Sequence, residues 1–257
     1  MSNDSHAAAE PAPGGGKAIW SRLLPVALVG AGLAAFFGLG LNQYFSLDAL
    51  EENRDLLSAF VTDNRFIALA AFIGIYAAAV SISVPGASIL TIFGGFLFGL
   101  WFGTAAVVIG ATLGATIIFF ITKTALGDVL RGKASGFVKR MEEGFREDAF
   151  SYLFSLRLIP AVPFWVLNIV PGVLGVKARD FILATFLGII PATFVYVSIG
   201  NGIDAVFDAG ERPTLSGVLL KPEILLPIFG LAALGLMPVI YKKVFAKKKT
   251  TTLEGAH

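Results

Sequence analysis

The feature that most constrains this chain is a long stretch without a charged residue, from Phe66 to Thr122. A helix that crosses a bilayer uses roughly 20 mostly apolar residues, so the stretch is long enough for nearly three crossings. Charged side chains are kept out of hydrocarbon because burying them there is costly. We therefore expect this stretch to lie in lipid, or in contact with protein that does.

The composition of the whole chain indicates a membrane protein and excludes several function classes. Of the 257 residues, 56% are hydrophobic and 15% are charged, and the mean hydropathy is +0.78. The net charge is only +2 and no basic segment interleaves with aromatics, so we expect no nucleic-acid partner. Cysteine is absent, and the two histidines, His6 and His257, lie in the terminal tails. Because the body has no Cys or His for metal ligation or nucleophilic catalysis, we predict no enzyme activity, metal or cofactor.

The N-terminal part is predicted to hold one membrane span and one surface helix. Residues 1–18 are small and polar, and we expect a disordered tail because they cannot bury enough apolar surface. In the segment 19–65, the apolar run Leu23–Leu41 predicts the first transmembrane helix. A cleaved signal peptide is the alternative, since two basic residues precede the run. Residues 43–65 place apolar side chains at near-helical spacing among charges, which predicts an amphipathic interfacial helix.

The middle of the uncharged stretch is interrupted by proline and glycine. It reads VPGASILTIFGGFLFGLWFG and begins with Val84, Pro85 and Gly86. Proline removes a backbone donor and glycine weakens a helix, so a regular span is not expected. We predict a re-entrant hairpin near residues 84–104, with its turn shielded by protein. The alternative, compatible with the first, is that the glycines form a small-residue packing face.

A second interrupted segment is predicted near residues 150–176. It contains FSLRLIPAVPFWVLNIVPGVLG, in which Pro160, Pro163 and Pro171 fall too close together for a continuous helix. When Pro85 is set beside Pro160, Gly99 falls next to the position of Gly175, and an uncharged helix follows each segment. This pattern predicts a weak inverted repeat, typical of transporters with a site near the bilayer midplane.

The remaining segments define topology. Residues 180–200 predict a span, 201–241 predict a loop and the last transmembrane helix over 222–241, and 242–257 form a basic C-terminal tail. The Lys/Arg-rich connector 123–149 and the basic tail are both expected on the cytoplasmic side. The number of crossings and the side of the N-terminus stay open.

These residues resemble the DedA-like superfamily, also called the VTT-domain or SNARE-associated Golgi protein family. The resemblance covers roughly residues 66–200 and is carried by VPGASILTIFGGFLFG, by LRLIPAVPFWVLNIVPG and by the helix around Phe181. It implies an all-α integral membrane bundle with two facing re-entrant hairpins. It also implies lipid-directed activity, because eukaryotic relatives are phospholipid scramblases and bacterial relatives are implicated in recycling undecaprenyl phosphate and in proton-dependent envelope homeostasis.

The family pattern transfers to individual positions. Arg157 matches the arginine that opens the second-hairpin motif. The other matching positions are Gly94, Gly95, Gly99, Pro160, Asn168, Pro171 and Gly172. Unlike the DedA branch, this chain has no acidic residue in the first hairpin, and Pro163 and its neighbours stand where that branch has a second arginine. The chain therefore looks closer to the SNARE-associated branch, which puts proton coupling through hairpin carboxylates in doubt.

Two polar residues are the candidates for substrate binding. Arg157 is the only charge between Asp148 and Lys177, and its five-donor fork suits a phosphate, so we expect it to hold a lipid phosphate between the hairpins. The alternative is an arginine that snorkels to the interface or caps carbonyls. Asn168 either forms a hydrogen bond with a headgroup oxygen or donates to free carbonyls of the broken helix, and we favour the second role. Four hydroxyls of the first hairpin region either line it or satisfy backbone: Ser81, Ser83, Ser88 and Thr91.

The sequence therefore predicts a lipid transporter, scramblase-like or flippase-like, that moves phospholipid or polyprenyl-phosphate headgroups across the bilayer. The alternatives are a proton- or ion-coupled small-solute transporter and a non-catalytic membrane scaffold. We expect a multi-pass protein of a bacterial cytoplasmic membrane, with membrane lipids as partners and with homo-oligomer formation left open.

Overall fold

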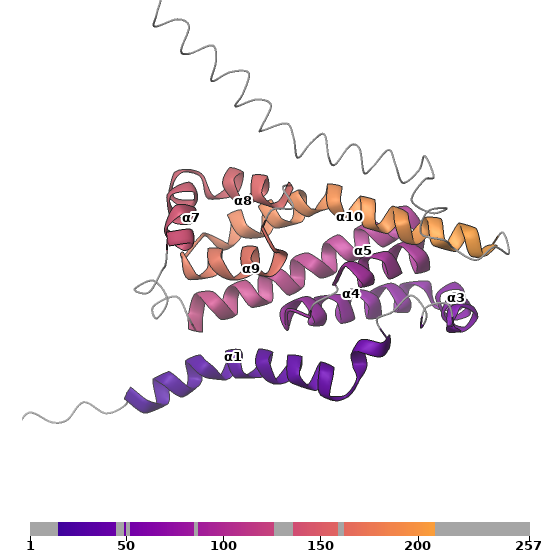
Figure 1. Cartoon of the computed structure of the whole chain (residues 1–257), viewed down its shortest axis with the longest axis horizontal. Helices are drawn as coiled ribbons and strands as arrows, with labels where there is room; N and C mark the ends of the chain where they lie inside the picture. The colour runs from indigo at the N-terminus through magenta and orange to yellow at the C-terminus, as the bar shows by residue number, and fades with distance from the viewer. Residues whose placement is uncertain are drawn as a thin grey trace, which may run out of the picture.

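The computed structural model describes residues 15–44, 49, 52–84, 87–125, 136–158 and 162–208. Every regular element among these residues is a helix, so the prediction of an all-α protein is confirmed for this part of the chain. The predicted last span 222–241 and the basic tail 242–257 lie outside the described residues. Figure 1 shows the helices gathered in one bundle, with the first helix along its edge.

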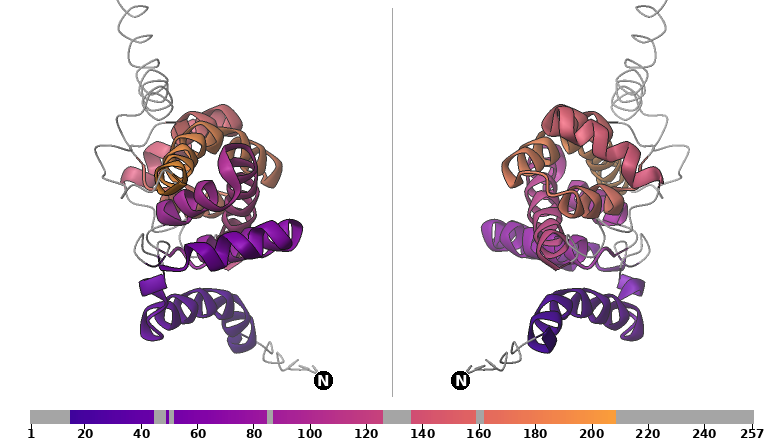
Figure 2. Two further views of the ribbon diagram at one scale, coloured as in Figure 1. Left: turned by 90° about the vertical axis from the view of Figure 1, so that its right-hand side faces the viewer. Right: turned by 90° about the vertical axis from the view of Figure 1, so that its left-hand side faces the viewer.

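The first helix, α1 (Gly15–Gly38), covers most of the predicted first span and begins within the segment predicted as a tail. A short 3-10 helix, η1 (Leu41–Tyr44), follows it. Leu28 and Phe37 of α1 are exposed, as expected for apolar side chains whose solvent is lipid. In both end-on views of Figure 2, α1 lies to one side of the other helices.

A sharp bend separates the next two helices. The chain bends by 117° between α3 (Arg54–Asp63) and α4 (Arg65–Ser81). None of the α3 residues is buried, whereas α4 buries one face against the bundle, including Phe72 and Tyr76. The predicted amphipathic segment, residues 43–65, is thus helical over Arg54–Asp63, and its position at a membrane surface stays a prediction.

α5 (Ala87–Ala125) is the central element, and it is broken at Gly99, which has φ 72° and ψ −176°. The backbones of Gly94 and Gly103 are in contact, so the chain reverses direction at the break. In a straight helix with a rise of about 1.5 Å per residue, those two positions would be more than about 10 Å apart. A helical hairpin therefore lies inside the predicted segment 84–104, and its entry and exit on one side of a membrane stay a prediction.

The second interrupted segment is also broken. α7 (Gly136–Glu147) leads into α8 (Ala149–Leu158). After a break, α9 (Phe164–Val173) begins with Pro163 as its N-cap residue. Pro171 lies inside the last turn of α9, so among the described prolines of this segment only Pro163 lies at the interruption. Pro160, like Pro85 and Gly86, lies outside the described residues.

α10 (Ala178–Asp208) closes the bundle. It packs on α5 and α8, whereas α9 packs on α5, so the two arms of the second broken segment lie on different central helices (Figure 1). Gly175, between α9 and α10, has φ 75°, close to that of Gly99. Both interrupted segments thus end on a glycine in the left-handed region, which other residues adopt only at a cost. The inverted repeat itself stays a prediction from the sequence.

Glycines allow α5 and α10 to approach closely. A Cβ at Gly95 would collide with the Val197 carbonyl, and one at Gly200 would collide with the Ile92 carbonyl. Gly172 of α9 lies equally close to Thr122. The packing-face alternative is therefore correct for Gly95, while Gly99 serves the turn instead.

Two described helices are long and apolar enough to cross a membrane, Ala87–Ala125 and Ala178–Asp204, and the bent α3–α4 pair would make a third. Large apolar side chains are exposed along one face of α5 at helical spacing: Ile109, Leu113, Ile117 and Phe120. The opposite face supplies core residues such as Phe119, which stacks on Phe181 of α10 at 4.2 Å. An exposed apolar helix face is expected when the surrounding solvent is lipid.

Candidate functional site

Arg157 lies in the last turn of α8 and is only 7% exposed. Among the described residues it has no carboxylate partner. The alternative of an arginine that snorkels to the surface is therefore not what this structure shows. A buried guanidinium without a counter-ion is costly unless other groups or a ligand satisfy it.

Polar groups from two other helices hold one end of the guanidinium. Nη2 of Arg157 donates to Oδ1 of Asn168 at 2.7 Å and to Oγ1 of Thr185 at 3.0 Å. The Leu167 carbonyl is farther away, at 3.5 Å. Asn168 therefore positions Arg157, a role that neither of our two expectations for Asn168 included.

Aromatic rings and a glycine complete the setting of the guanidinium. Its carbon lies 4.5 Å from the ring centre of Phe164 and 5.8 Å from that of Phe181. Gly188 leaves room for the arginine stem, because a Cβ there would be 2.7 Å from Cβ of Arg157. Phe181, Thr185 and Gly188 occupy one face of α10, at i, i+4 and i+7. Sequence reasoning missed this face, although a threonine in an uncharged helix was a usable signal.

The other donors of Arg157 are unpaired. Nε and Nη1 are buried and make no hydrogen bond to any described residue. Leaving buried donors unpaired costs free energy, more so when the group is charged. Nε–H and Nη1 lie on different edges of the guanidinium, so each can donate to an acceptor oxygen of an anion, a ligand that the positive charge favours.

Arg157 lines a cavity of about 230 Å³ where the two interrupted segments face each other. Ser88 and Thr91 come from the first segment, and Val162 and Phe164 come from the second. α4 and α10 supply the remaining walls. We name this space the arginine cavity. Both segments thus supply residues to the same cavity as Arg157, as expected.

Hydroxyl groups form the wall of the arginine cavity that belongs to the first segment. Tyr76 Oη and Thr91 Oγ1 are 2.8 Å apart, and Thr91 also donates to the Ala87 carbonyl at 3.0 Å. Ser81 donates to the Ala77 carbonyl at 2.7 Å, so it satisfies backbone as the alternative expectation had it. Ser88 and Thr91 line the cavity. Tyr76 was not among the residues singled out from the sequence.

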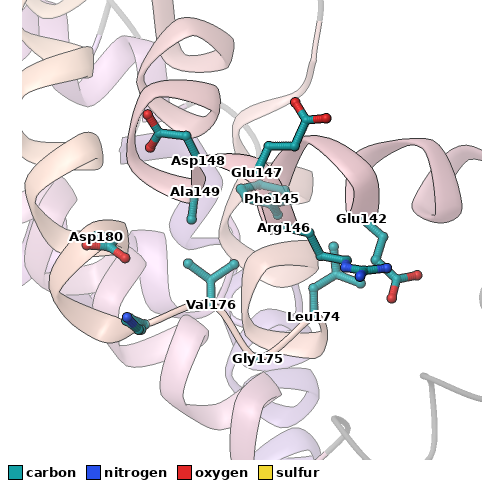
Figure 3. Close-up of a pocket in the computed structure, with 11 residues that line it drawn as sticks. Glu142, Phe145, Arg146, Glu147, Asp148, Ala149, Leu174, Gly175, Val176 and Asp180 are labelled. Atoms are coloured by element: carbon teal, nitrogen blue, oxygen red, sulfur yellow. The ribbon is translucent and has the colours of Figure 1, made fainter.

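A second hollow, of about 520 Å³, lies where the α7–α8 corner meets the α9–α10 corner (Figure 3). Charged side chains surround an apolar floor that includes Phe145 and Val176, with Glu142 and Arg146 on one side and Asp180 on another. Asp148 accepts the backbone N–H of Ser151 at 3.1 Å, and hydrogen bonds from the Ser151 side chain and backbone lower the pKa of Asp148. Among the described residues, no cluster of three or more His, Cys, Asp or Glu is arranged to hold a metal.

The described part of the chain is that of an all-helical membrane protein, with a buried arginine in a cavity between two interrupted segments. Residues 84–202 match the VTT domain family. This match confirms the resemblance read from the motifs: the chain carries a VTT domain. Both Arg157 and the glycine contacts between α5 and α10 lie inside the matched range.

Similar proteins include transmembrane proteins of eukaryotes. A transmembrane protein 41 homolog of Dictyostelium discoideum is 31% identical over 74% of this chain and 55% of its own length. The homolog of Caenorhabditis elegans is 28% identical over 76% of this chain and 78% of its own length. Transmembrane protein 41B of Mus musculus is 28% identical over 70% and 60%. The chain thus spans less than two-thirds of the Dictyostelium and mouse proteins. No solved structure matches it.

Proposed function

We propose that this protein moves lipids across a bilayer by passing their phosphate headgroups through the arginine cavity while the acyl chains stay in the membrane. One observation carries the proposal. Arg157 is buried between the two interrupted segments, and its Nε and Nη1 make no hydrogen bond to a described residue. A lipid phosphate that binds there would accept from one of these donors and neutralise the charge.

The surroundings of Arg157 support transient rather than tight binding. One side of the cavity offers only hydroxyls and apolar groups, such as Ser88 and Ile189, so the phosphate meets a single full charge. Transport requires a site that binds well enough to admit the headgroup and weakly enough to release it. Phospholipid and polyprenyl phosphate share this chemistry, so the substrate class is a lipid with a phosphate headgroup.

The interrupted helices support a route through the bundle. Irregular backbone at membrane depth is tolerated where protein or a cavity shields it. The start of α5 and both sides of the α8–α9 break line the arginine cavity. The proposal places the protein in the bacterial cytoplasmic membrane, with the Lys/Arg-rich connector on the inner side.

The test is reconstitution of the whole chain into liposomes with a fluorescently labelled phospholipid or polyprenyl phosphate. Lysine cannot reproduce the planar fork, so we expect Arg157→Lys to slow lipid redistribution on the order of tenfold, about 1.4 kcal/mol of barrier. The matched control is Arg54→Lys. Arg54 pairs with Asp204 at 3.3 Å, away from the cavity, and its replacement is expected to leave the rate unchanged.

Each result points to one function. Redistribution without any gradient, slowed by Arg157→Lys alone, supports the proposal. An unchanged rate in Arg157→Lys overturns the role of the arginine. Uptake of a small solute that depends on an ion gradient, with no lipid movement, identifies the ion-coupled transporter instead. If neither occurs, the scaffold remains.

A further inference from the structure

Another cavity, distinct from both hollows described above, lies on the other side of the first residues of α9. It measures about 530 Å³ and is formed by α1, the end of α4, the start of α5 and α9. Its lining is mostly apolar and includes Leu33, Val84 and Trp165, with three polar residues among them: Ser83, Ser88 and Asn168. We name it the α1 cavity.

The two cavities share a wall. Ala87, Ser88 and Phe164 line both of them. Phe164 is the first residue of α9, directly after the Pro163 cap, and its ring lies over the Arg157 guanidinium at 4.5 Å. The other two shared residues are small. Among the described residues, Phe164 is therefore the only large side chain that lines both cavities and separates them.

Asn168 joins the two cavities chemically. Its Oδ1 accepts from Arg157, because an arginine can only donate. Its amide NH₂ is thereby left as the donor group, and it makes no hydrogen bond to a described residue. Asn168 lines the α1 cavity while Arg157 lines the arginine cavity. A ligand in the α1 cavity that carries uncharged acceptor oxygens would pair with this amide.

The backbone at the edge of the α1 cavity is strained. Ser83 has φ 56°, in the left-handed region that a non-glycine residue rarely adopts. Its N–H bonds the Val80 carbonyl at 3.0 Å, which ends α4 just before the first interruption. Such outliers concentrate at functional sites, where the surrounding structure holds them in place.

We propose that the α1 cavity is a second lipid subsite, which takes the uncharged ester and upper acyl-chain region of the lipid, and that Phe164 is the side chain a headgroup must displace to pass between the cavities. This inference rests on the proposed function. Ester oxygens match the amide of Asn168, and methylene groups match Leu33, Val84 and Trp165. The ligand class is a glycerol-ester amphiphile, whose phosphate reaches Arg157 past the Phe164 ring.

The subsite is tested without any transport. The chain has no cysteine, so Ser83→Cys introduces a single thiol in the α1 cavity. In maltoside micelles, lysophosphatidylglycerol is expected to slow modification of this thiol by N-ethylmaleimide severalfold, while inorganic phosphate leaves the rate unchanged. The matched control is Thr116→Cys, on α5 and outside both cavities, where neither compound changes the rate. Equal rates with and without lysophosphatidylglycerol in the Ser83→Cys protein overturn the subsite.

The partition is tested in liposomes with the whole chain. Phe164→Ala is expected to speed lipid redistribution severalfold, and Phe164→Trp to slow it severalfold. Phe66→Ala is the control, because Phe66 is 86% exposed and lines neither cavity. If Arg157→Lys slows transport but both Phe164 variants match the parent protein, the partition is wrong and the proposed function stands. If the parent protein moves no lipid, the proposed function fails, and thiol protection still decides the subsite.

Discussion

The two interrupted halves of the molecule share an order of elements but differ in what fills their breaks. In each half a helix is followed by a proline, a short helix, a glycine at positive φ and a long helix. Aligning Pro85 with Pro160 sets Ile82 opposite Arg157 and Phe93 opposite Asn168. The first half is thus apolar at the positions where the second half is polar.

The difference shows a division of labour. In the first half, close backbone contacts seal the break, with Gly94 against Gly103 and Gly95 against Val197. In the second half, Arg157 and Asn168 fill the break and leave donors unpaired. The first half is closely packed at its break, whereas the second half holds polar groups there. The variants described below should separate these two properties.

The largest effect is expected where the halves touch. In Gly95→Ala the new methyl group meets the backbone of Val197, with Cα of that residue only 2.9 Å away, and backbone cannot step aside. We expect the free energy of unfolding to fall by about 3 kcal/mol or more, measured by thermal unfolding of the purified protein. Gly74→Ala is the control, because nothing lies within 4 Å of its Cβ position. Equal stability of the two variants would contradict the close approach.

A gain of stability is expected from making the second half resemble the first. The double variant Arg157→Met, Asn168→Leu removes the buried charge together with its acceptor. The hydroxyl of Thr185 can then donate to a carbonyl of its own helix, as threonine does in helices. We expect unfolding to become harder by about 1–4 kcal/mol while lipid movement is lost. A double variant that is both destabilised and active would show that the arginine serves structure alone.

A smaller loss is expected from each of the two turn glycines. Gly99→Ala and Gly175→Ala each place a Cβ at φ above 70°, which costs about 1–3 kcal/mol. At Gly99 the Cβ would meet only Oδ1 of Asn201, at an ordinary contact distance of 3.6 Å, so conformation sets its cost. The ψ of Gly99, −176°, belongs to a region essentially restricted to glycine, so Gly99→Asn should recover no stability relative to Gly99→Ala. Thermal unfolding measures both losses, and unchanged stability in either variant would contradict the positive φ at that position.

The smallest effect concerns Asp148, at the outer end of the second half. Because hydrogen bonds from Ser151 lower the pKa of Asp148, its contribution to stability is present above its unfolded pKa of about 3.9 and is lost as pH falls through the folded value. We expect Asp148→Ala to unfold at a slightly lower temperature near neutral pH, with the difference closing at strongly acidic pH. Asp148→Asn keeps the cap and serves as the control. A gap that persists after acidification would rule out the carboxylate as its cause.

The sequence was enough to predict the all-α class, the family and the two interruptions, because charge exclusion and proline placement are local signals. It also pointed to Arg157, the lone charge of its segment. It could not reveal that Asn168 serves the arginine, nor that Thr185 and Phe164 complete the setting, since these contacts depend on how α8, α9 and α10 converge. The sequence also could not show that Gly95 is needed for close helix packing and Gly99 for the turn, because the two differ only in their dihedral angles and neighbours.

The boundary of the VTT domain cuts through the α1 cavity. The matched range begins at residue 84, yet Leu33, Val80 and Ser83 line that space. A fragment trimmed to the domain would keep Arg157 but would lack the residues before position 84 that line the α1 cavity. Changes in the preceding helices could therefore retune which lipids are accepted while every family motif stays intact.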